Sequence, residues 1–406
     1  IQTFGTSDKT FLTVMVVVVI SALIAVAAIW ERARIPLGTA VLVAAGVAGS
    51  VAVLNQPGGT VVDLVPTILG TVCGVAVVRM LTKTAPTPTQ TVPQTDPPQT
   101  DPAGPNPDRR RSLLTLGLLG FGAISGVGGT VLTRNRRSVA GDREAFTLPK
   151  ITSPAPPIPP GVQPAGAGLP SFITSNADFY RIDTALSVPQ LARENWKLRI
   201  HGMVDREITY TFADLAGFEV VERPVTLTCV SNPVGGELIS NAMWTGYRVR
   251  DLLKRSGIRP DADMVLSTSS DGFTAGTPVE ALTDNREAML AVGMNGVPLP
   301  VEHGYPARLV VPGLYGFVSA TKWVVDLEVT RFDRAEAYWT KLGWSAKAPI
   351  KTESRIDVPR TGSRVPAGPV TVGGVAWAQN IGIKGVEVRI DNGPWQPATL
   401  GAAYSN

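Results

Sequence analysis

An uncharged apolar stretch near the N-terminus limits what this chain can fold into more than any other feature. Residues 11–30 (FLTVMVVVVISALIAVAAIW) carry no charge and, as a helix, are long enough to cross the hydrocarbon core of a bilayer. Residues 36–56 and 61–81 are similarly apolar, and residues 112–133 form a fourth stretch that is rich in Gly. Hydrophobic core helices of this length without charges are unusual. The pattern predicts a multi-pass α-helical anchor in the cell membrane.

Basic residues in the short loops predict how this anchor is oriented. Arginines follow the first apolar stretch and basic residues end the third, whereas the loop 55–60 between the second and third is uncharged. The excess of Lys and Arg on the cytoplasmic side then places residues 1–10 outside, which requires a further span upstream. We therefore expect three transmembrane helices in residues 1–83 of a chain that is itself a fragment.

A polar segment separates the third apolar stretch from the fourth. Residues 84–111 are rich in Thr, Pro, Gln and Asp, which predicts a disordered linker. The linker ends in three arginines at 109–111, which are either flanking cytoplasmic charge or an internal twin-arginine export signal. Further arginines within 134–137 suit the export signal better than ordinary Sec insertion. Export would place everything after residue 134 outside the cytoplasm.

The remaining two thirds of the chain have the texture of folded domains. Residues 134–172 are Pro-rich and predict a tether. Residues 173–349 mix short strands with short helical patterns, which predicts an α+β domain. The expected strands lie at 196–201, 225–230, 264–267, 307–311 and 322–330, and the expected helices at 211–216 and 249–256. Strand patterns at 370–377 and 385–390 make 350–406 a partial Ig-like β-sandwich.

The charge balance excludes one class of partner. The net charge is +4, and the Lys and Arg residues are scattered rather than gathered with aromatic residues along one stripe. Nucleic-acid-binding domains usually show such a stripe or patch. We therefore expect no nucleic-acid partner.

Cys229 is the only cysteine after residue 134, so no intramolecular disulfide is available to it there. It follows a strand-like run and precedes polar and Gly-rich residues. A lone cysteine is often a small buried hydrophobe. The alternatives are a thiolate that ligates a soft metal and a nucleophile paired with a histidine. The residues around Cys229 do not by themselves choose among these three readings.

Five motifs in a fixed order carry a resemblance to a known family. They are TLTCVSN at 226–232, WTGYRVRDLL at 244–253, MNGVPLP at 294–300, HGYPARLVVPG at 303–313 and the pair Lys322-Trp323. Together they resemble the sulfite oxidase family of molybdopterin-dependent oxidoreductases, most closely its membrane-anchored actinobacterial branch. The resemblance covers residues 173–345 and the start of the family's C-terminal Ig-like domain. It implies a molybdopterin (molybdenum) cofactor and two-electron oxygen-atom transfer on a small-molecule substrate.

The resemblance also assigns roles to individual residues. Cys229 would be the metal ligand, and Arg308 and Lys322 would bind the phosphate of the pterin, because a guanidinium fork and an ammonium suit phosphate. The other cofactor-binding residues would be Asn176, Phe179, Tyr180, Asn232, Asp271, His303, Ala320 and Thr321. The alternatives are a turn histidine for His303, a solvated turn residue for Asp271 and a core aromatic pair for Phe179 and Tyr180.

Two departures from the family pattern bear on the substrate. Members that oxidise sulfite carry an Arg in the segment that here reads FYRID (179–183). Whether Arg181 takes the place of that Arg is left open by the sequence, and Asp183 would repel a dianion. These members also carry a Tyr after the Lys-Trp pair, a place that Trp344 takes in this chain. We predict that Asp183 and Trp344 lie at the catalytic centre and that the substrate is not sulfite. A sulfite dehydrogenase and a non-catalytic, anchored Ig-like surface module remain the alternatives.

The predicted redox partner is a separate protein. The chain lacks a Cys-x-x-Cys-His haem motif, and its two histidines, His201 and His303, lie in the folded part rather than in the anchor. We therefore expect a cytochrome or a quinone-linked protein to exchange electrons with it. Members of the family often form homodimers through the Ig-like domain, so a homodimer is a further expectation.

Overall fold

The computed structural model describes residues 15, 22, 37–54, 61–82, 138–164, 168–185 and 187–404. The chain divides into two compact units, Ile1–Ser138 and Val139–Asn406. The predicted linker 84–111 and the fourth apolar stretch 112–133 lie outside the described residues, as does all of the first apolar stretch except Met15 and Ala22.

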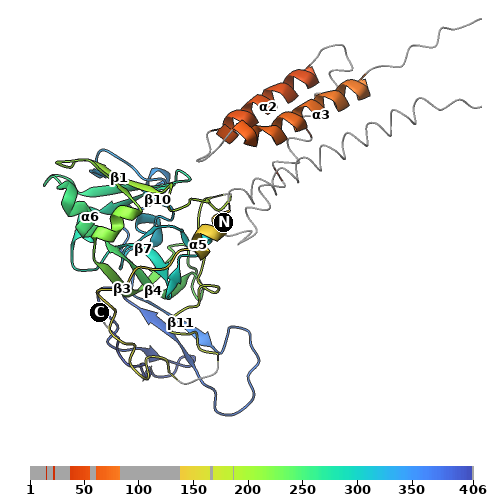
Figure 1. Cartoon of the computed structure of the whole chain (residues 1–406). Coiled ribbons are helices and arrows are strands. Elements are labelled where there is room, and N and C mark those ends of the chain that lie inside the picture. The colour runs from red at the N-terminus through yellow and green to blue at the C-terminus, as the bar shows by residue number, and fades with distance from the viewer. Residues whose placement is uncertain are drawn as a thin grey trace, which may run out of the picture. The chain divides into compact units, whose positions relative to one another are not determined.

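The described part of the first unit is a helical hairpin (Figure 1). Helix α2 spans Leu37–Leu54, the 3₁₀ turn η2 spans Val61–Leu64, and helix α3 spans Val65–Thr82. The two α-helices approach closely through small residues. A Cβ atom on Gly49 would lie 3.3 Å from Thr67 Cγ2, and one on Gly46 would overlap Thr71. Small residues allow helix backbones to pack in this way.

One of these helices is long and apolar enough to cross a membrane. Among the described residues only α2 meets both conditions, and α3 contains the shorter apolar segment Val65–Met80. A single helix of this kind is weak support for an anchor, because a buried helix of a soluble protein can have the same length and composition. The multi-pass anchor therefore remains a prediction.

The second unit contains two five-stranded sheets. The first has the order β2-β1-β10-β5-β6, in which β1 and β10 run parallel and the other pairs are antiparallel. Its strands are β1 (Lys197–Gly202), β2 (Ile208–Thr211), β5 (Met264–Ser269), β6 (Thr274–Pro278) and β10 (Val324–Thr330). The second sheet is antiparallel, with the order β3-β4-β7-β8 and with β9 also paired to β7. Its strands are β3 (Val220–Thr228), β4 (Ile239–Arg248), β7 (Met289–Met294), β8 (Val297–Pro298) and β9 (Arg308–Val310).

Short helices connect and cover these sheets. The α-helices are α5 (Ala140–Glu144), α6 (Val249–Ser256) and α7 (Val279–Thr283), and the 3₁₀ turns are η3 (Ala213–Gly217), η4 (Val301–His303), η5 (Gly316–Val318) and η6 (Thr340–Leu342). Helix α6 begins and ends where the sequence predicts a helix. Its apolar side chains Leu252 and Leu253 are fully buried in a core shared with the first sheet. A second apolar cluster includes Phe179 and Trp244 and packs against the second sheet. The architecture is the α+β domain that the sequence predicts.

The N-terminal boundary of this unit differs from the sequence-based expectation. We expected a tether at 134–172 and a domain that starts at 173, but the structure places the boundary between Ser138 and Val139. The backbone N–H groups of Thr152 and Ser153 both donate to Val220 O at 3.0 Å, which attaches the segment to β3. The Pro-rich composition hides a few apolar residues that pack against the core, namely Phe146, Leu148 and Ile151.

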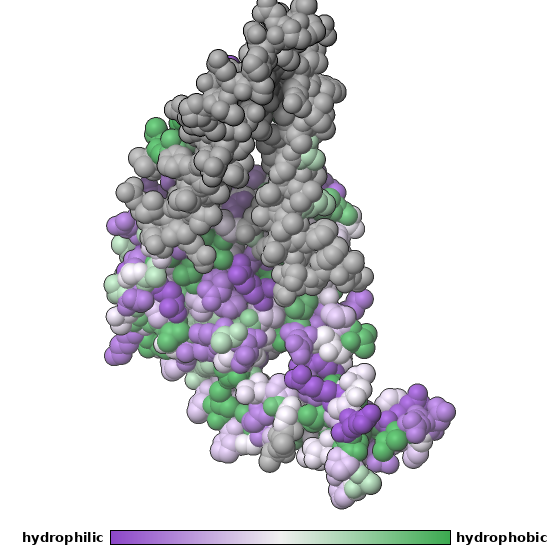
Figure 2. All heavy atoms as spheres, turned by 90° about the vertical axis from the view of Figure 1, so that its right-hand side faces the viewer, coloured by the Kyte–Doolittle hydropathy of each residue, from purple (hydrophilic) through white to green (hydrophobic). Residues whose placement is uncertain are grey.

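The C-terminal segment forms two small sheets. Strand β11 (Glu353–Val358) pairs with β12 (Gly373–Trp377), and β13 (Glu387–Val388) pairs with β14 (Gln396–Pro397). Strands β12 and β13 fall within the two predicted strand patterns. Apolar side chains such as Ile381 and Trp395 are exposed, and Figure 2 shows polar and apolar residues intermixed over the face of the molecule that it displays. The partial Ig-like sandwich remains a prediction.

Candidate active site

Cys229 stands directly after the last residue of β3, at the start of a closed loop. Its N–H donates to Leu238 O at 2.9 Å, and its carbonyl accepts from Asn232 N at 3.0 Å. The side chain of Asn232 stabilises the same loop, because its Oδ1 accepts from Leu238 N at 2.9 Å. Both ends of the loop are thus tied together, and the sulfur is held at the end of the second sheet.

The sulfur of Cys229 is a free thiol in surroundings that disfavour its charge. The side chain is partly buried, and burial raises the pKa of the thiol, although hydrogen bonds from Ser231 oppose this shift. A bound cation would reverse the preference, because metal coordination deprotonates a thiol. Among the described residues, no group of three or more His, Cys, Asp or Glu side chains could hold a metal ion. A metal at Cys229 would therefore take its other ligands from a bound group.

Two aromatic residues that precede β1 in the chain lie over this end of the sheet. The rings of Phe179 and Tyr180 stack with their centroids 5.5 Å apart, and Phe179 meets Trp244 and His303 edge to face. Burial and the neighbouring Cys229 raise the pKa of the Tyr180 phenol, and Arg308 acts in the opposite direction. The Tyr180 side chain therefore lies close enough to both Cys229 and Arg308 to interact with them electrostatically.

Arg308 is a buried cation whose acceptors in the described part of the chain are all neutral. It is 5% exposed, and its guanidinium donates to the carbonyls of His303 at 3.1 Å and of Ala320 at 3.4 Å. The guanidinium also lies over the ring of Trp244, 5.1 Å from its centroid. Burial lowers the pKa of Arg308 to about 10, and none of the described carboxylates contributes to that pKa. A buried charge without a counter-ion is costly, so Arg308 favours binding of an anion.

Lys322 is a second buried cation, but it has an acid partner. Its Nζ lies 2.7 Å from Asp183 Oδ2 and donates to Glu302 O at 3.1 Å. The ammonium also faces the ring of Trp323, 4.7 Å from its centroid. Burial lowers the pKa of Lys322 to about 8 against the opposing effect of Asp183.

His303 is neutral at physiological pH. Burial, followed by the charges of Arg308 and Lys322, lowers its pKa to about 4. Its Nε2 lies 3.3 Å from the carbonyl oxygen of Asn176. The Asn176 side chain is itself held by Asn295, whose Nδ2 donates to Asn176 Oδ1 at 2.7 Å. Asn176 thus connects the segment that precedes β1 to the second sheet and to His303.

The structure gathers most of the predicted site residues into one connected cluster, which we call the Cys229–Arg308 cluster. Its members are Cys229, Tyr180, Phe179, Asn176, His303, Arg308, Lys322 and Asp183, with the carbonyl of Ala320. Thr321 is adjacent, and its hydroxyl shares a 2.7 Å hydrogen bond with Ser267 while its carbonyl accepts from Leu309 N. Trp244 was not among the residues predicted for the site, although its place at the start of the motif WTGYRVRDLL was a usable signal.

Two predicted residues have other roles in the described structure. Asp271 is exposed, and its Oδ1 accepts from Phe273 N at 3.2 Å in a turn through Gly272, which is the turn role held open from the sequence. Trp344 packs against Trp339 and Phe317, with ring centroids 5.0 and 5.2 Å away. Phe317 follows Gly316, where a Cβ would lie 3.9 Å from Tyr180 Oη. Trp344 therefore belongs to an aromatic group beside the Cys229–Arg308 cluster.

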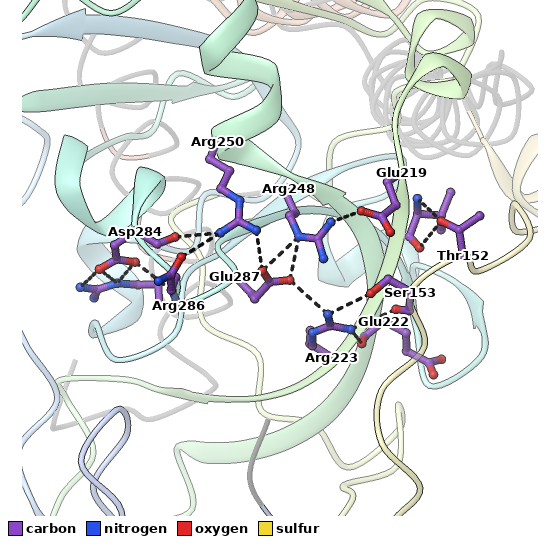
Figure 3. A network of polar contacts seen from close by, with 12 residues as sticks. Thr152, Ser153, Glu219, Glu222, Arg223, Arg248, Arg250, Asp284, Arg286 and Glu287 are labelled. Carbon is purple, nitrogen blue, oxygen red and sulfur yellow. Dashed lines mark hydrogen bonds and ion pairs between the residues drawn. The ribbon is translucent and has the colours of Figure 1, made fainter.

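A second charged network offers a contrast with Arg308 (Figure 3). Glu287 accepts from Arg248 at 2.8 Å, from Arg250 at 2.9 Å and pairs with Arg223 at 3.3 Å. Arg248 also pairs with Glu219, next to the first residue of β3. This network lies at the opposite end of β3 from Cys229, and its arginines are matched by acids. The charges of this network are paired with one another, whereas the guanidinium of Arg308 has no carboxylate partner among the described residues.

Two buried hydroxyl groups beside the cluster also lack partners among the described residues. Thr228 Oγ1 directly precedes Cys229, and Ser270 Oγ belongs to a residue whose N–H donates to Trp323 O at 2.9 Å. Unsatisfied buried polar atoms are rare in folded proteins, and a bound molecule, an ion or a water is one source of the missing partner. A lone thiol, an uncompensated guanidinium and two unpaired hydroxyls together fit an anionic group that carries a metal.

Comparison with known proteins identifies such a group. Residues 185–339 match the family described as oxidoreductase molybdopterin binding domain. The mitochondrial sulfite oxidase of Homo sapiens is 29% identical over 273 residues, which are 57% of this chain and 50% of that protein. Nitrate reductase [NADH] 1 of Oryza sativa subsp. japonica is 32% identical over 197 residues, which are 42% of this chain and 21% of that protein.

The chain thus spans half or less of these two relatives. A third relative is covered more fully: the uncharacterized oxidoreductase YuiH of Bacillus subtilis (strain 168) is 30% identical over 149 residues, which are 37% of this chain and 72% of that protein. The chemistry of the Cys229–Arg308 cluster, with one soft ligand and one free cation, suits a pterin that brings its own sulfur ligands and a phosphate. The chain therefore belongs to the molybdopterin-binding oxidoreductases related to sulfite oxidase, and molybdopterin is its cofactor.

Proposed function

We propose that this chain is a membrane-anchored oxidoreductase that transfers an oxygen atom, with two electrons, to or from a small substrate outside the cytoplasm. The observation that carries the proposal is the Cys229–Arg308 cluster. A single thiol and a buried guanidinium without a carboxylate lie within reach of the same phenol, Tyr180. The molybdenum of the bound cofactor supplies the redox chemistry.

The side chains of the cluster then have distinct roles in binding. Cys229 would ligate the metal, and Arg308 and Lys322 would neutralise the phosphate. The neutral imidazole of His303 adds hydrogen-bonding capacity without further charge. Phe179 and Trp244, both buried, exclude water from the Arg308 side of the site, and the backbone at Ala320 and Thr321 with the side chains of Asn176 and Asn232 completes the proposed binding set.

The proposed substrate is a small molecule other than sulfite, such as an S- or N-oxide. Trp344 lies in an aromatic group with Trp339 and Phe317, which is apolar rather than cationic. Asp183 is weaker evidence against sulfite than its position in the sequence suggests, because Lys322 and Arg181 offset its negative charge. Sulfite dehydrogenase remains the second candidate, favoured by the similarity to a sulfite oxidase.

The setting of the enzyme is also proposed. The apolar helix α2 and the other apolar stretches support a multi-pass anchor in the cell membrane, as in the membrane-anchored actinobacterial branch. The arginines before the fourth stretch support twin-arginine export of the catalytic unit. A separate cytochrome or quinone-linked protein would exchange the electrons, and the C-terminal segment would support a homodimer.

The test is a metal analysis and an activity assay of the full chain, expressed in a host that makes the cofactor and purified in detergent. We expect close to one molybdenum and one pterin per chain. Redox-dye assays should give turnover with a panel of S- and N-oxides and little with sulfite. Turnover with sulfite alone would establish the sulfite dehydrogenase instead. Absence of both metal and pterin would favour the non-catalytic surface module.

A further inference from the structure

The pair formed by Asp183 and Lys322 is the least accessible ion pair of the described residues. The side chains are 4% and 8% exposed, and the charged atoms are 2.7 Å apart. The two residues lie 139 positions apart in the chain, Asp183 in the segment before β1 and Lys322 two residues before β10. Removal of one partner from a buried pair of this kind strongly destabilises the fold, because the other charge is left buried without compensation.

The same carboxylate oxygen serves a second cation. Asp183 Oδ2 also accepts from Arg181 Nε at 2.8 Å, and the Arg181 side chain is 39% exposed. The partners of Asp183 therefore include one that is buried and one at the rim of the cluster. If Lys322 were to turn to another anion, Asp183 would still keep Arg181.

The charges of the cluster are not balanced without a bound group. Arg308 has neutral acceptors, whereas Lys322 is offset by Asp183. A phosphate group carries about −1.5 to −2 charges near neutral pH. Arg308 alone would leave much of that charge uncompensated, and an Asp183 still bound to Lys322 would add a like charge beside it.

We propose that Asp183 is a placeholder counter-ion, which holds Lys322 in the cofactor-free protein and yields it to the phosphate of the cofactor on loading. This inference rests on the proposed binding role of Lys322. Asp183 then relaxes onto Arg181 at the rim. Its function is to keep the empty site folded and receptive, rather than to face the substrate.

The proposal predicts opposite effects for two neighbouring substitutions. Asp183→Asn keeps the size of the side chain but removes its charge. Lys322 then lacks a counter-ion in the empty protein, whereas in the loaded protein the phosphate of the cofactor supplies one. The melting temperature of this variant should fall by roughly 5 °C or more in the cofactor-free form and clearly less in the loaded form. Arg181→Gln removes the partner that Asp183 needs after loading, so it should lower the melting temperature of the loaded form more than that of the empty form.

The experiment compares full chains purified in detergent from hosts that make or lack the cofactor. Melting temperature and molybdenum per chain are measured for wild type, Asp183→Asn and Arg181→Gln. Asp284→Asn is the matched control, because Asp284 forms a 2.7 Å pair with Arg286 outside the cluster. This substitution should lower the melting temperature of the loaded and the empty protein equally.

Two outcomes would overturn the proposal. One is an Asp183→Asn variant that loses as much stability when loaded as when empty. The other is a loaded Arg181→Gln protein as stable as the wild type. Should Asp183→Asn fail to accumulate in the empty form but accumulate when loaded, the placeholder role is supported. A wild-type protein that takes up no molybdenum overturns the proposed function, and this inference with it, before any variant is compared.

Discussion

At the scale of single residues, Cys229 and Arg308 are distinguished by the partners that they lack among the described residues. Among the described residues, the thiol belongs to no group of three or more His, Cys, Asp or Glu side chains that could hold a metal ion. Among the described residues, the guanidinium has only carbonyl acceptors and an indole face. Both groups are therefore incomplete in the same place, and one anionic, metal-bearing cofactor would complete both.

Replacing the thiol tests the first half of this argument. Cys229→Ser should lose at least about 100-fold in dye-linked activity and most of its molybdenum, because a hydroxyl does not provide a thiolate to the metal. The far-UV circular dichroism should be unchanged, since the loop is held by backbone groups. Cys73→Ser, the same substitution in α3, is the control and should keep its metal. Full activity in Cys229→Ser would disprove the ligand assignment.

Two charge removals test the second half. Arg308→Met should abolish retention of the cofactor without lowering the melting temperature of the empty protein, because an uncompensated buried charge is removed. Glu287→Gln should lower the stability of the protein but leave cofactor retention intact. It leaves Arg248, Arg250 and Arg223 without their shared acid and should cost about 3 kcal/mol of stability with the cofactor content unchanged. Loss of molybdenum in Glu287→Gln would contradict the distinction between the two charge clusters.

The low pKa of His303 predicts a dependence of stability on pH. The folded-state pKa is about 4 and the ordinary value 6.5. Between these values the unfolded chain binds more protons than the folded one, so the free energy of unfolding decreases as the pH falls. The loss from His303 between pH 7 and pH 5 should be roughly 2 kcal/mol. Urea unfolding followed by tryptophan fluorescence measures it, and His303→Gln should lack this part of the slope. An unchanged slope in the variant would show that the imidazole titrates normally.

At the scale of elements, the short helix α5 and the residues that follow it pack as part of the domain and do not form a separate tether. Asp142 receives two hydrogen bonds from the Arg193 guanidinium at 2.8 and 3.0 Å and one from the buried Tyr305 hydroxyl at 2.6 Å. Arg143 donates to the carbonyls of Leu299 and Pro298. These contacts connect residues before the predicted domain to the motif that supplies His303 and Arg308.

Removal of this segment should therefore weaken the domain. A protein that starts at residue 173 should unfold at a lower urea concentration than one that starts at residue 139, by at least about 3 kcal/mol in free energy, because the apolar side chains of residues 146–151 lose their burial. Tyr305→Phe in the longer protein should cost about 1 to 2 kcal/mol, the value of one hydrogen bond to a charged group. Equal stability of the two truncations would restore the tether interpretation.

At the scale of the whole molecule, the two units differ in the solvent that their surfaces suit. Helix α2 leaves most of its apolar side chains exposed, among them Val47 and Val51. The second unit buries two clusters of large apolar side chains, although others in its C-terminal segment, such as Ile381 and Trp395, are exposed. Exposed apolar side chains of the kind on α2 would be stabilised by lipid, which is why a membrane anchor is proposed for the first unit.

This difference predicts how the chain partitions in a cell. The full chain should stay in the membrane pellet after alkaline carbonate extraction, whereas residues 139–406 produced alone should remain in the supernatant. Immunoblots of the two fractions measure the distribution. Extraction of the full chain into the supernatant would show that the apolar stretches do not anchor it.

The sequence alone determined the local chemistry of this protein. The motifs around Cys229, His303, Arg308 and Lys322 are contiguous runs of residues, so the α+β class and the cofactor were readable from them, and the residues predicted to bind the cofactor lie in or near these runs. The position of Cys229 at a strand end was readable for the same reason, because strand patterns and turn residues are short-range signals.

Only the tertiary structure decided which charges are paired. Asp183 meets Lys322 across 139 positions and Asp142 meets Tyr305 across 163, whereas Arg308 meets no described carboxylate. Composition made residues 134–172 look like a tether, yet a few apolar side chains there pack against the core. Contacts between distant residues depend on how the two sheets and their connections fold together, and neither spacing nor composition records that. The free guanidinium of Arg308 and the occupied ammonium of Lys322 are therefore properties of the fold.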